Sequence, residues 1–180
     1  MVENKFERLL LTGAAGGVGR VLRETLKPMA RVLRLSDVQS LGTAGEGEEL
    51  HPCDLSDRRA VDEMVRGCDA IVHMGGVSVE RPFEEILEAN IKGVFHLYEA
   101  ARRHGLDVTN MGYSGSARGE IPSAEEIAAL PADVITLAHG TNCWTRIPFS
   151  VGMFREGLIA FVDIVRQGHP ETPIVAVSPI

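Results

Sequence analysis

The sequence predicts an α/β fold, a single three-layer αβα domain around a doubly wound, mostly parallel sheet of about seven strands. Short apolar runs alternate along the whole chain with amphipathic stretches, which is typical of strands and helices that alternate to build a parallel sheet covered on both faces. The 180 residues are the size of one domain, and a composition of 44% hydrophobic and 24% charged residues is ordinary for a globular protein.

The expected strands are short apolar segments bounded by polar or glycine-containing stretches. In chain order they are Arg8–Thr12, Arg31–Leu35, Glu49–Cys53, Ala70–Met74, Asp107–Met111, Val134–Ala138 and Ile174–Ser178. A doubly wound sheet of this kind has the default strand order 3-2-1-4-5-6-7.

Three helices are predicted most clearly. Apolar residues recur at helical spacing over Phe83–His104 and again over Phe154–Arg166, which Gly168 then ends. Ser123, followed three positions later by Glu126, predicts a capping box at the start of a further helix.

Composition narrows the classes of partner. A net charge of −7 argues against nucleic acid and against an anionic membrane, and the apolar runs are too short to span a bilayer. The polar start of the sequence carries no secretory signal, so we expect a cytoplasmic protein. Three widely spaced cysteines, Cys53, Cys68 and Cys143, suit reduced buried thiols better than disulfides. No cysteine or histidine pair has the spacing of a metal site, so no metal is expected.

A glycine-rich segment follows the first expected strand and opens a helix. It reads Thr-Gly-Ala-Ala-Gly-Gly-Val-Gly from Thr12 to Gly19. In Rossmann folds such a loop places helix N–H groups against a pyrophosphate. Gly13 permits the tight turn, Gly16 lets the backbone approach the phosphates, and Gly19 lets the helix pack close to the strand. The expected cofactor contacts in this loop are Gly13, Ala15, Gly16, Gly17, Val18 and Gly19.

An acidic residue follows the second expected strand. Asp37 lies 24 positions after Gly13 (37 − 13), where a carboxylate can accept both ribose hydroxyls of NAD and repels the extra phosphate of NADP. The sequence therefore predicts NAD as the preferred cofactor. The alternative is a glycine-rich turn used only for packing.

From about Phe6 to Gly105 the residues resemble the extended short-chain dehydrogenases/reductases, and within them the uronate dehydrogenases. The resemblance rests on the glycine loop, Ser36-Asp37, Cys53-Asp54-Leu55, His73–Gly76 and Asn90–Gly93. It implies that Asp54 bonds the adenine amine, that Leu55 packs on the ring, and that Gly75 and Gly76 line the cofactor. It also implies that Asn90 supports a proton relay. A turn cap at Asp54 and an inward structural hydrogen bond at Asn90 are the alternatives.

The proton-transfer pair of that family is missing from the sequence. The family uses Tyr-x-x-x-Lys, in which the lysine lowers the pKa of the tyrosine. Here Tyr98 is followed at that spacing by Arg102 and Tyr113 by Ala117, and Lys92 is the last lysine. We also expect 180 residues to be too few to hold the substrate-binding lobe of an intact dehydrogenase.

From about Asp107 onward the residues resemble the SGNH, or GDSL-like, hydrolases. The motifs are Asn110–Gly115 and Leu137–Asn142. The resemblance implies that Gly115 donates a backbone N–H, and Asn142 a side-chain N–H, to an oxyanion. Plain strand-to-helix turns are the alternative. The serine and histidine blocks of that family are absent, and Ser78 is the nearest hydroxyl to the serine position. Packing or capping is the expected role of His139 and His169.

Four hypotheses follow. The first is a recombined or engineered chimera, one domain over residues 1–180 built from a Rossmann-like NAD-binding fragment, 1–106, and a hydrolase-like fragment, 107–180. It would have no complete active site, only the remnants Asn90, Gly115 and Asn142. The others are a module that binds NAD without turnover, an SGNH-type ester hydrolase, and an NAD-dependent uronate dehydrogenase-like oxidoreductase. A monomer and a homodimer through unpaired sheet edges both stay open.

Overall fold

The computed structural model describes residues 5–111, 118–144 and 150–177. Its internal contacts divide the chain into two compact units, residues 1–108 and 109–180. The division lies directly after the change of motifs that the sequence shows at Gly105–Asp107. The assignment of residues 1–180 to one domain stays a prediction.

The first unit is built on a four-stranded parallel sheet. Its strands are β1 (Phe6–Thr12), β2 (Ala30–Ser36), β3 (Glu48–Leu50) and β4 (Ala70–His73), in the order β3-β2-β1-β4. The central strand β1 places Leu9, Leu10 and Leu11 at 0% exposure. Consecutive apolar residues can all be buried because both faces of the sheet are covered. The first four expected strands and the first part of the predicted order are confirmed.

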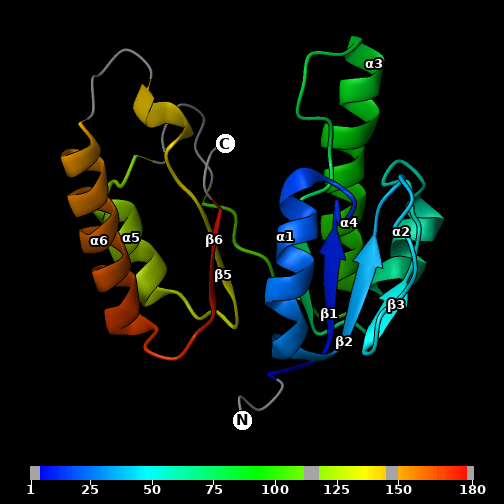
Figure 1. Ribbon diagram of the computed structural model, residues 1–180, viewed down its shortest axis with the longest axis horizontal. Helices are drawn as coiled ribbons and strands as arrows, with labels where there is room; N and C mark the ends of the chain where they lie inside the picture. The colour runs from blue at the N-terminus through cyan, green and yellow to red at the C-terminus, as the bar shows by residue number, and fades with distance from the viewer. Residues whose placement is uncertain (1–4, 112–117, 145–149, 178–180) are drawn as a thin grey trace. The chain divides into compact units, whose positions relative to one another are not determined.

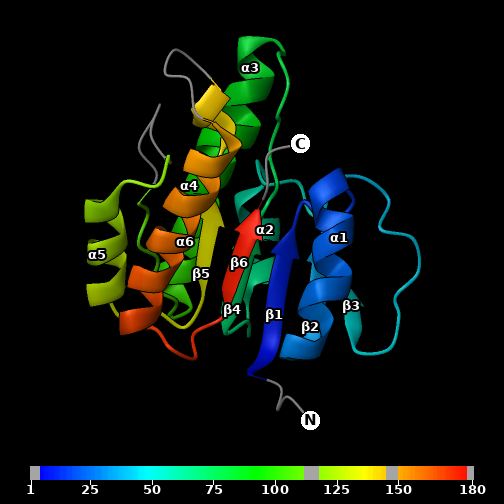
Figure 2. The same ribbon diagram turned by 60° about the vertical axis from the view of Figure 1, so that its left-hand side comes forward.

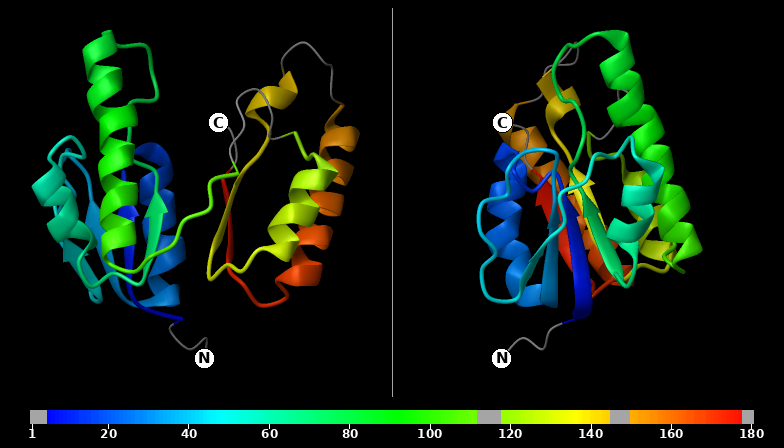
Figure 3. Two further views of the ribbon diagram at one scale, coloured as in Figure 1. Left: turned by 180° about the vertical axis from the view of Figure 1, so that it is seen from behind. Right: turned by 90° about the vertical axis from the view of Figure 1, so that its right-hand side faces the viewer.

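Helices cover both faces of this sheet. The helical elements are α1 (Gly17–Leu26), η1 (Lys27–Met29), α2 (Arg58–Val65), α3 (Phe83–Ile86), η2 (Leu87–Lys92) and α4 (Gly93–Arg103). Helix α1 lies on one face, and α2 with α4 lies on the other (Figures 1 and 3). On the α2 and α4 face, Leu10 packs with Leu55, Met64 and Leu97 in one apolar cluster.

Phe83–Arg103 is one continuous helix (Figure 3). Its middle segment, η2, is a π-helix of 6 residues, a form that occurs often at functional sites. The helix stops at Gly105, whose φ of 80° suits glycine, and the N–H of Leu106 bonds back to the carbonyl of Ala101 at 2.9 Å. Gly105 is thus a helix-ending glycine.

The second unit contains a two-stranded parallel sheet. Its elements are α5 (Ile121–Ala129), β5 (Ile135–Ala138), η3 (Thr141–Trp144), α6 (Val151–Gly168) and β6 (Ile174–Val177). Strands β5 and β6 lie side by side (Figure 2), and α5 and α6 pack on one face of them (Figure 1). Phe161 and Val165 of α6 form the core of this unit with Ile135 and Leu137 of β5.

The prediction of a strand at Asp107–Met111 is wrong, because these residues have no regular secondary structure. The strands of the described residues form two sheets, not one sheet of about seven strands. The Asp107 side chain accepts the N–H of Val108 at 2.8 Å, and Val108 is 46% exposed. A side chain that takes up the backbone donor competes with a strand ladder, and the segment holds too few apolar residues to offset that loss.

Two helix starts also differ from the expected ones. Ser123 is not a cap, because α5 begins at Ile121 and Pro122 occupies its first turn. Proline suits that position because its fixed φ is helical and no partner for an N–H is needed there. Helix α6 begins before the expected Phe154, and the Ser150 hydroxyl caps it by accepting the N–H of Met153 at 3.1 Å.

Within the described residues, no helix is long and apolar enough to cross a membrane. The same part of the chain holds no group of three or more His, Cys, Asp or Glu side chains that could bind a metal ion.

The three cysteines are free and buried. Burial raises the pKa of the Cys53 and Cys68 thiols to about 11, so little thiolate forms near neutral pH. We expect the native protein at pH ~8 to react with a thiol reagent at least about tenfold more slowly than after unfolding in urea. Absorbance of the released chromophore measures both rates. Equal rates in the native and unfolded protein would contradict the burial of these thiols.

Candidate cofactor-binding site

The glycine-rich loop connects β1 to α1 as the sequence predicts. Gly13 has a φ of 69°, and Gly16 in extended conformation precedes α1 and donates its N–H to the Gly13 carbonyl at 3.1 Å. No side chain caps the start of α1, and its first turn contains no acidic residue. The N–H groups and the positive end of the helix dipole are therefore not neutralised by the helix's own side chains.

Two of the loop glycines lie where a side chain does not fit. A Cβ on Gly19 would overlap the carbonyl oxygen of Gly13 and come within 2.8 Å of the Ala14 Cα. A Cβ on Gly13 would lie 2.5 Å from the carbonyl carbon and oxygen of Met74. The loop is thus held tightly between α1 and the end of β4, while a Cβ on the exposed Gly17 would meet nothing within 4 Å.

Asp37 lies against this loop. Its Oδ2 accepts the N–H of Ala15 at 3.0 Å, and its Oδ1 accepts the N–H of Gln39 at 2.9 Å. A carboxylate oxygen has two lone-pair sites, so each oxygen keeps one for a further donor. The structure therefore brings Asp37 against the loop at Ala15, from which it is 22 residues away in the sequence.

The segment after β4 borders the loop on its other side. The Thr12 hydroxyl, at the end of β1, accepts the N–H groups of Met74 and Gly75, both at 3.2 Å. A Cβ on Gly75 would lie 3.1 Å from Leu55 and 3.5 Å from the nitrogen of Gly13. Gly75 thus passes closely between two of the other predicted contact residues.

Asn90 acts structurally in this segment. Its side-chain oxygen accepts the N–H of Val77 at 2.7 Å, and its side-chain nitrogen donates to the Val77 carbonyl at 2.8 Å. Gly76, with a φ of 148°, passes so close that a Cβ there would lie 2.9 Å from the Asn90 oxygen. The inward hydrogen bond expected as the alternative to a proton relay is present, and it fixes the backbone after β4 from the π-helical segment.

Asp54 and Leu55 both have structural contacts. Asp54 is exposed and its carboxylate accepts the N–H of Ser56 at 2.9 Å, which makes it a turn cap. The helix cap proper is Asp57, which accepts two N–H groups at the start of α2. Leu55 is 9% exposed and packs in the core of the first unit. Their contacts to adenine stay predictions.

The second unit places the predicted hydrolase residues as follows. Gly115 lies outside the described residues. Asn142 lies on η3 and is half-buried. His139 follows β5 and packs edge-on against Phe161, with ring centroids 4.5 Å apart. The buried His169 ends α6, and its Nε2 lies 2.9 Å from the Ile127 carbonyl, a capping and packing role. In the first unit, Ser78 is exposed.

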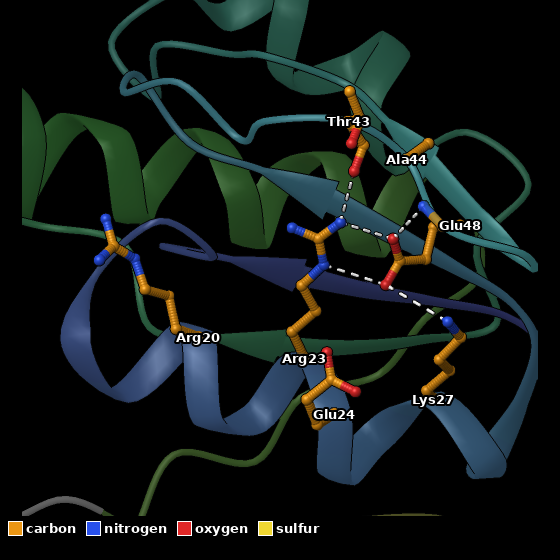
Figure 4. A pocket seen from close by; sticks show the side chains of 8 residues that line it. Arg20, Arg23, Glu24, Lys27, Thr43, Ala44 and Glu48 are labelled. Atoms are coloured by element: carbon orange, nitrogen blue, oxygen red, sulfur yellow. Dashed lines mark hydrogen bonds and ion pairs between the residues drawn. The ribbon is translucent and has the colours of Figure 1, made fainter.

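A second polar cluster joins α1 to the segment between β2 and β3 (Figure 4). The Arg23 guanidinium donates to both oxygens of Glu48, at 3.0 and 2.6 Å, and to the carbonyls of Leu41 and Thr43. Lys27 lies 3.9 Å from the same carboxylate. We call this set the Arg23–Glu48 clasp. It holds the segment that begins at Asp37, and Arg23, Lys27, Thr43 and Glu48 border an open cavity of about 360 Å³.

Sequence reasoning missed one pair in the site. Thr12 and His73 are partners in the β1–β4 register, and the Thr12 hydroxyl lies 2.7 Å from the Nδ1 of His73. Both residues belong to motifs that the sequence shows, but the motifs gave neither side chain a role. The pairing depends on the register of two strands 61 residues apart, which the order of residues alone does not specify.

Comparison with known proteins identifies relatives of the first unit. Uronate dehydrogenase of Pseudomonas syringae pv. tomato is 65% identical over 105 residues, covering 58% of this chain and 38% of that protein. The Agrobacterium fabrum uronate dehydrogenase is 54% identical over 121 residues, covering 67% of this chain and 46% of that protein. The chain therefore spans less than half the length of these curated relatives.

Comparison with solved structures finds the same kind of relative. A crystal structure of a variant uronate dehydrogenase from Agrobacterium tumefaciens, complexed with NAD, is 62% identical with a TM-score of 0.54, and the match covers 55% of this chain and 37% of that one. The Bordetella bronchiseptica enzyme WbmH in complex with NAD+ matches 96% of this chain and 55% of its own at 13% identity and a TM-score of 0.53. That second likeness shows the fold alone, a parallel Rossmann-like α/β architecture.

The family assignment extends beyond the first unit. The model of the NAD dependent epimerase/dehydratase family matches residues 9–136, and so continues past the change of motifs at Gly105–Asp107 and past Asn110. These matches support neither a hydrolase fragment nor a chimera, and the oxyanion roles expected for Gly115 and Asn142 are left without support. Because the family model covers well over half of the length of this chain, the chain belongs to the NAD dependent epimerase/dehydratase family.

Proposed function

We propose that this chain binds NAD, in preference to NADP, through its first unit, as the cofactor-binding part of a uronate dehydrogenase-type oxidoreductase. The observation that carries the proposal is Asp37. Backbone N–H groups fix both of its oxygens beside the glycine loop, and each oxygen retains a lone pair for a ribose hydroxyl.

The loop itself fits a dinucleotide. The start of α1 carries no side-chain cap, so the N–H groups of its first turn are available to a pyrophosphate. A Cβ at Gly13 or Gly19 would clash with neighbouring backbone and disturb the loop that presents these groups. Gly75 borders the same loop after the end of β4, and Gly76 follows it against Asn90. Bound NAD supplies a hydride acceptor, and the chain's own residues bind and orient it.

The similarity to uronate dehydrogenases supports uronate as the substrate class. The sequence contains no Tyr-x-x-x-Lys pair, so the part of the activity proposed for this chain is cofactor binding. Absorbance of NADH formed on addition of a hexuronate tests for turnover as well.

Calorimetric titration of the full chain with NAD tests the proposal. We expect a dissociation constant in the micromolar range or weaker and weaker binding of NADP. Asp37→Asn should weaken NAD binding at least about tenfold, because it removes the charge that strengthens two hydrogen bonds to ribose. It should also reduce the discrimination against NADP.

The matched control is Asp69→Asn. The Asp69 carboxylate likewise accepts two backbone N–H groups, those of Glu7 and Arg8, both at 2.8 Å. It does so at the start of β1, at the other end of the strands from Asp37. NAD affinity should not change in this variant. A flat titration of the wild-type chain up to millimolar NAD would reject the proposed function.

A further inference from the structure

We propose that His73 is a positioning residue of the cofactor site, acting through the hydroxyl of Thr12 on the backbone of Gly75. The proposal rests on the proposed function, since the site that His73 would organise is the one assigned to NAD. His73 ends β4, and Thr12 ends β1 beside it.

The hydrogen bonds around the Thr12 oxygen determine the direction of its proton. A hydroxyl oxygen accepts two hydrogen bonds and donates one. The N–H of Gly75 occupies one acceptor position at 3.2 Å, and the N–H of Met74, which also donates to the Thr12 carbonyl at 3.2 Å, shares the other. Thr12 is only 1% exposed, so water does not compete for the proton of its hydroxyl. The proton therefore goes to the Nδ1 of His73, at 2.7 Å.

This arrangement requires a neutral imidazole with its proton on Nε2. If Nδ1 were protonated as well, two donors would face each other across 2.7 Å, and the Thr12 oxygen would have three N–H groups for two lone pairs. The hydroxyl would then have to give up the amide of Met74 or Gly75. The neutral state is favoured because burial lowers the pKa of His73, and no charged side chain among the described residues adds to or opposes that shift.

Gly75 is the point at which this bond affects the cofactor. Its backbone lies between Leu55 and Gly13, at distances where a Cβ would meet both. Asn90 anchors Val77 two residues later. The segment from His73 to Val77 is thus fixed at two points, by Thr12 near its start and by Asn90 at its end. Loss of the bond to the Thr12 hydroxyl loosens Gly75, while Met74 stays paired with the Thr12 carbonyl.

Calorimetry with NAD on the full chain at pH values from about 7.5 to about 4.5 tests the proposal. The wild-type affinity should fall about fivefold as the pH drops through the pKa of His73, the effect of one hydrogen bond. His73→Asn keeps an acceptor near the position of Nδ1 but cannot titrate, so it should bind as the wild type does at neutral pH and keep that affinity in acid. His73→Phe, which has no acceptor, should bind about fivefold more weakly at every pH.

His51→Asn is the control. His51 is another histidine of the same unit with a pKa lowered by burial, and this variant should retain the wild-type pH profile. The proposal is overturned if His73→Asn shows the wild-type pH profile or if His73→Phe binds NAD as tightly as the wild type.

Nitrogen chemical shifts of the imidazole in the cofactor-free protein provide a readout independent of NAD. They should show His73 unprotonated at Nδ1 at neutral pH, and a protonated Nδ1 would overturn the proposal. A wild-type chain that binds no NAD at any pH would reject the proposed function and the positioning role together. Even then, the shifts would still decide whether the Thr12 bond exists.

Discussion

Replacing Gly19 with alanine should destabilise the first unit by at least about 3 kcal/mol, a large part of the stability of an ordinary domain. The added Cβ would overlap the Gly13 carbonyl oxygen and lie within 2.8 Å of the Ala14 Cα and the Gly13 carbonyl carbon. All three are backbone atoms, which cannot move away as the end of a flexible side chain can. Relief requires α1 to separate from β1, and that would uncover the Leu22 and Leu26 side chains, which are buried.

Gly17→Ala is the matched control, on the same helix two residues earlier. A Cβ on Gly17 meets nothing within 4 Å, and its φ is not among the positive ones. Alanine should therefore stabilise the protein by roughly 0.5–1 kcal/mol, because the unfolded chain loses freedom. Urea unfolding followed by circular dichroism measures both changes. Equal midpoints for Gly19→Ala and the wild type would mean that helix and strand are not packed as closely as the structure has them.

The first unit could be predicted from the sequence because its signals are local. A strand, a glycine loop and a helix follow each other without interruption from Phe6 to Leu26, and each has the residues that its geometry requires. Strands β2 and β4 contain apolar residues that the structure buries, such as Leu33, Leu35 and Val72, whereas the edge strand β3 is Glu-Glu-Leu and only partly buried. The strand expected at Asp107–Met111 failed because the Asp107 side chain takes up the N–H of Val108 and the segment holds few apolar residues.

The site was predicted only in part, for a physical reason. Gly13, Gly19 and Asp37 could be found because backbone geometry and charge demand those residue types at that spacing. The contacts of Thr12 with His73 and of Asn90 with Val77 depend on which residues of distant segments meet. Strand register and the π-helical segment η2 determine those contacts, and neither leaves a pattern in the order of residues.

Acid should weaken the Arg23–Glu48 clasp and with it the first unit. The hydrogen bond from Arg23, followed by the Gly45 N–H and the charge of Lys27, lowers the pKa of Glu48 from 4.5 to about 2. A carboxyl whose pKa is lower in the folded state stabilises the fold above its unfolded pKa, and that contribution is lost as the pH falls toward the folded value. The contribution, about 3 kcal/mol at neutral pH, should therefore disappear between pH ~4.5 and ~2.

Glu48→Gln should remove this contribution at all pH values. At pH ~7 we expect a loss of about 2–4 kcal/mol, because the Arg23 guanidinium, whose side chain is 21% exposed, then loses the carboxylate to which it is hydrogen-bonded. The free energy of unfolding of this variant should also change less with pH between ~4.5 and ~2 than that of the wild type. Urea unfolding at a series of pH values measures both effects.

An exposed ion pair separates this burial effect from charge alone. Glu7 pairs with Arg31 at 2.6 Å, but the two side chains are 75% and 64% exposed. Glu7→Gln should change stability by less than about 0.5 kcal/mol, because water screens that pair. A Glu48→Gln variant that unfolds with the wild-type pH dependence would show that the Glu48 carboxylate does not contribute to holding the segment after Asp37. Arg23 would then act on the side of the site where the ribose of NAD is expected only through its bonds to the Leu41 and Thr43 carbonyls.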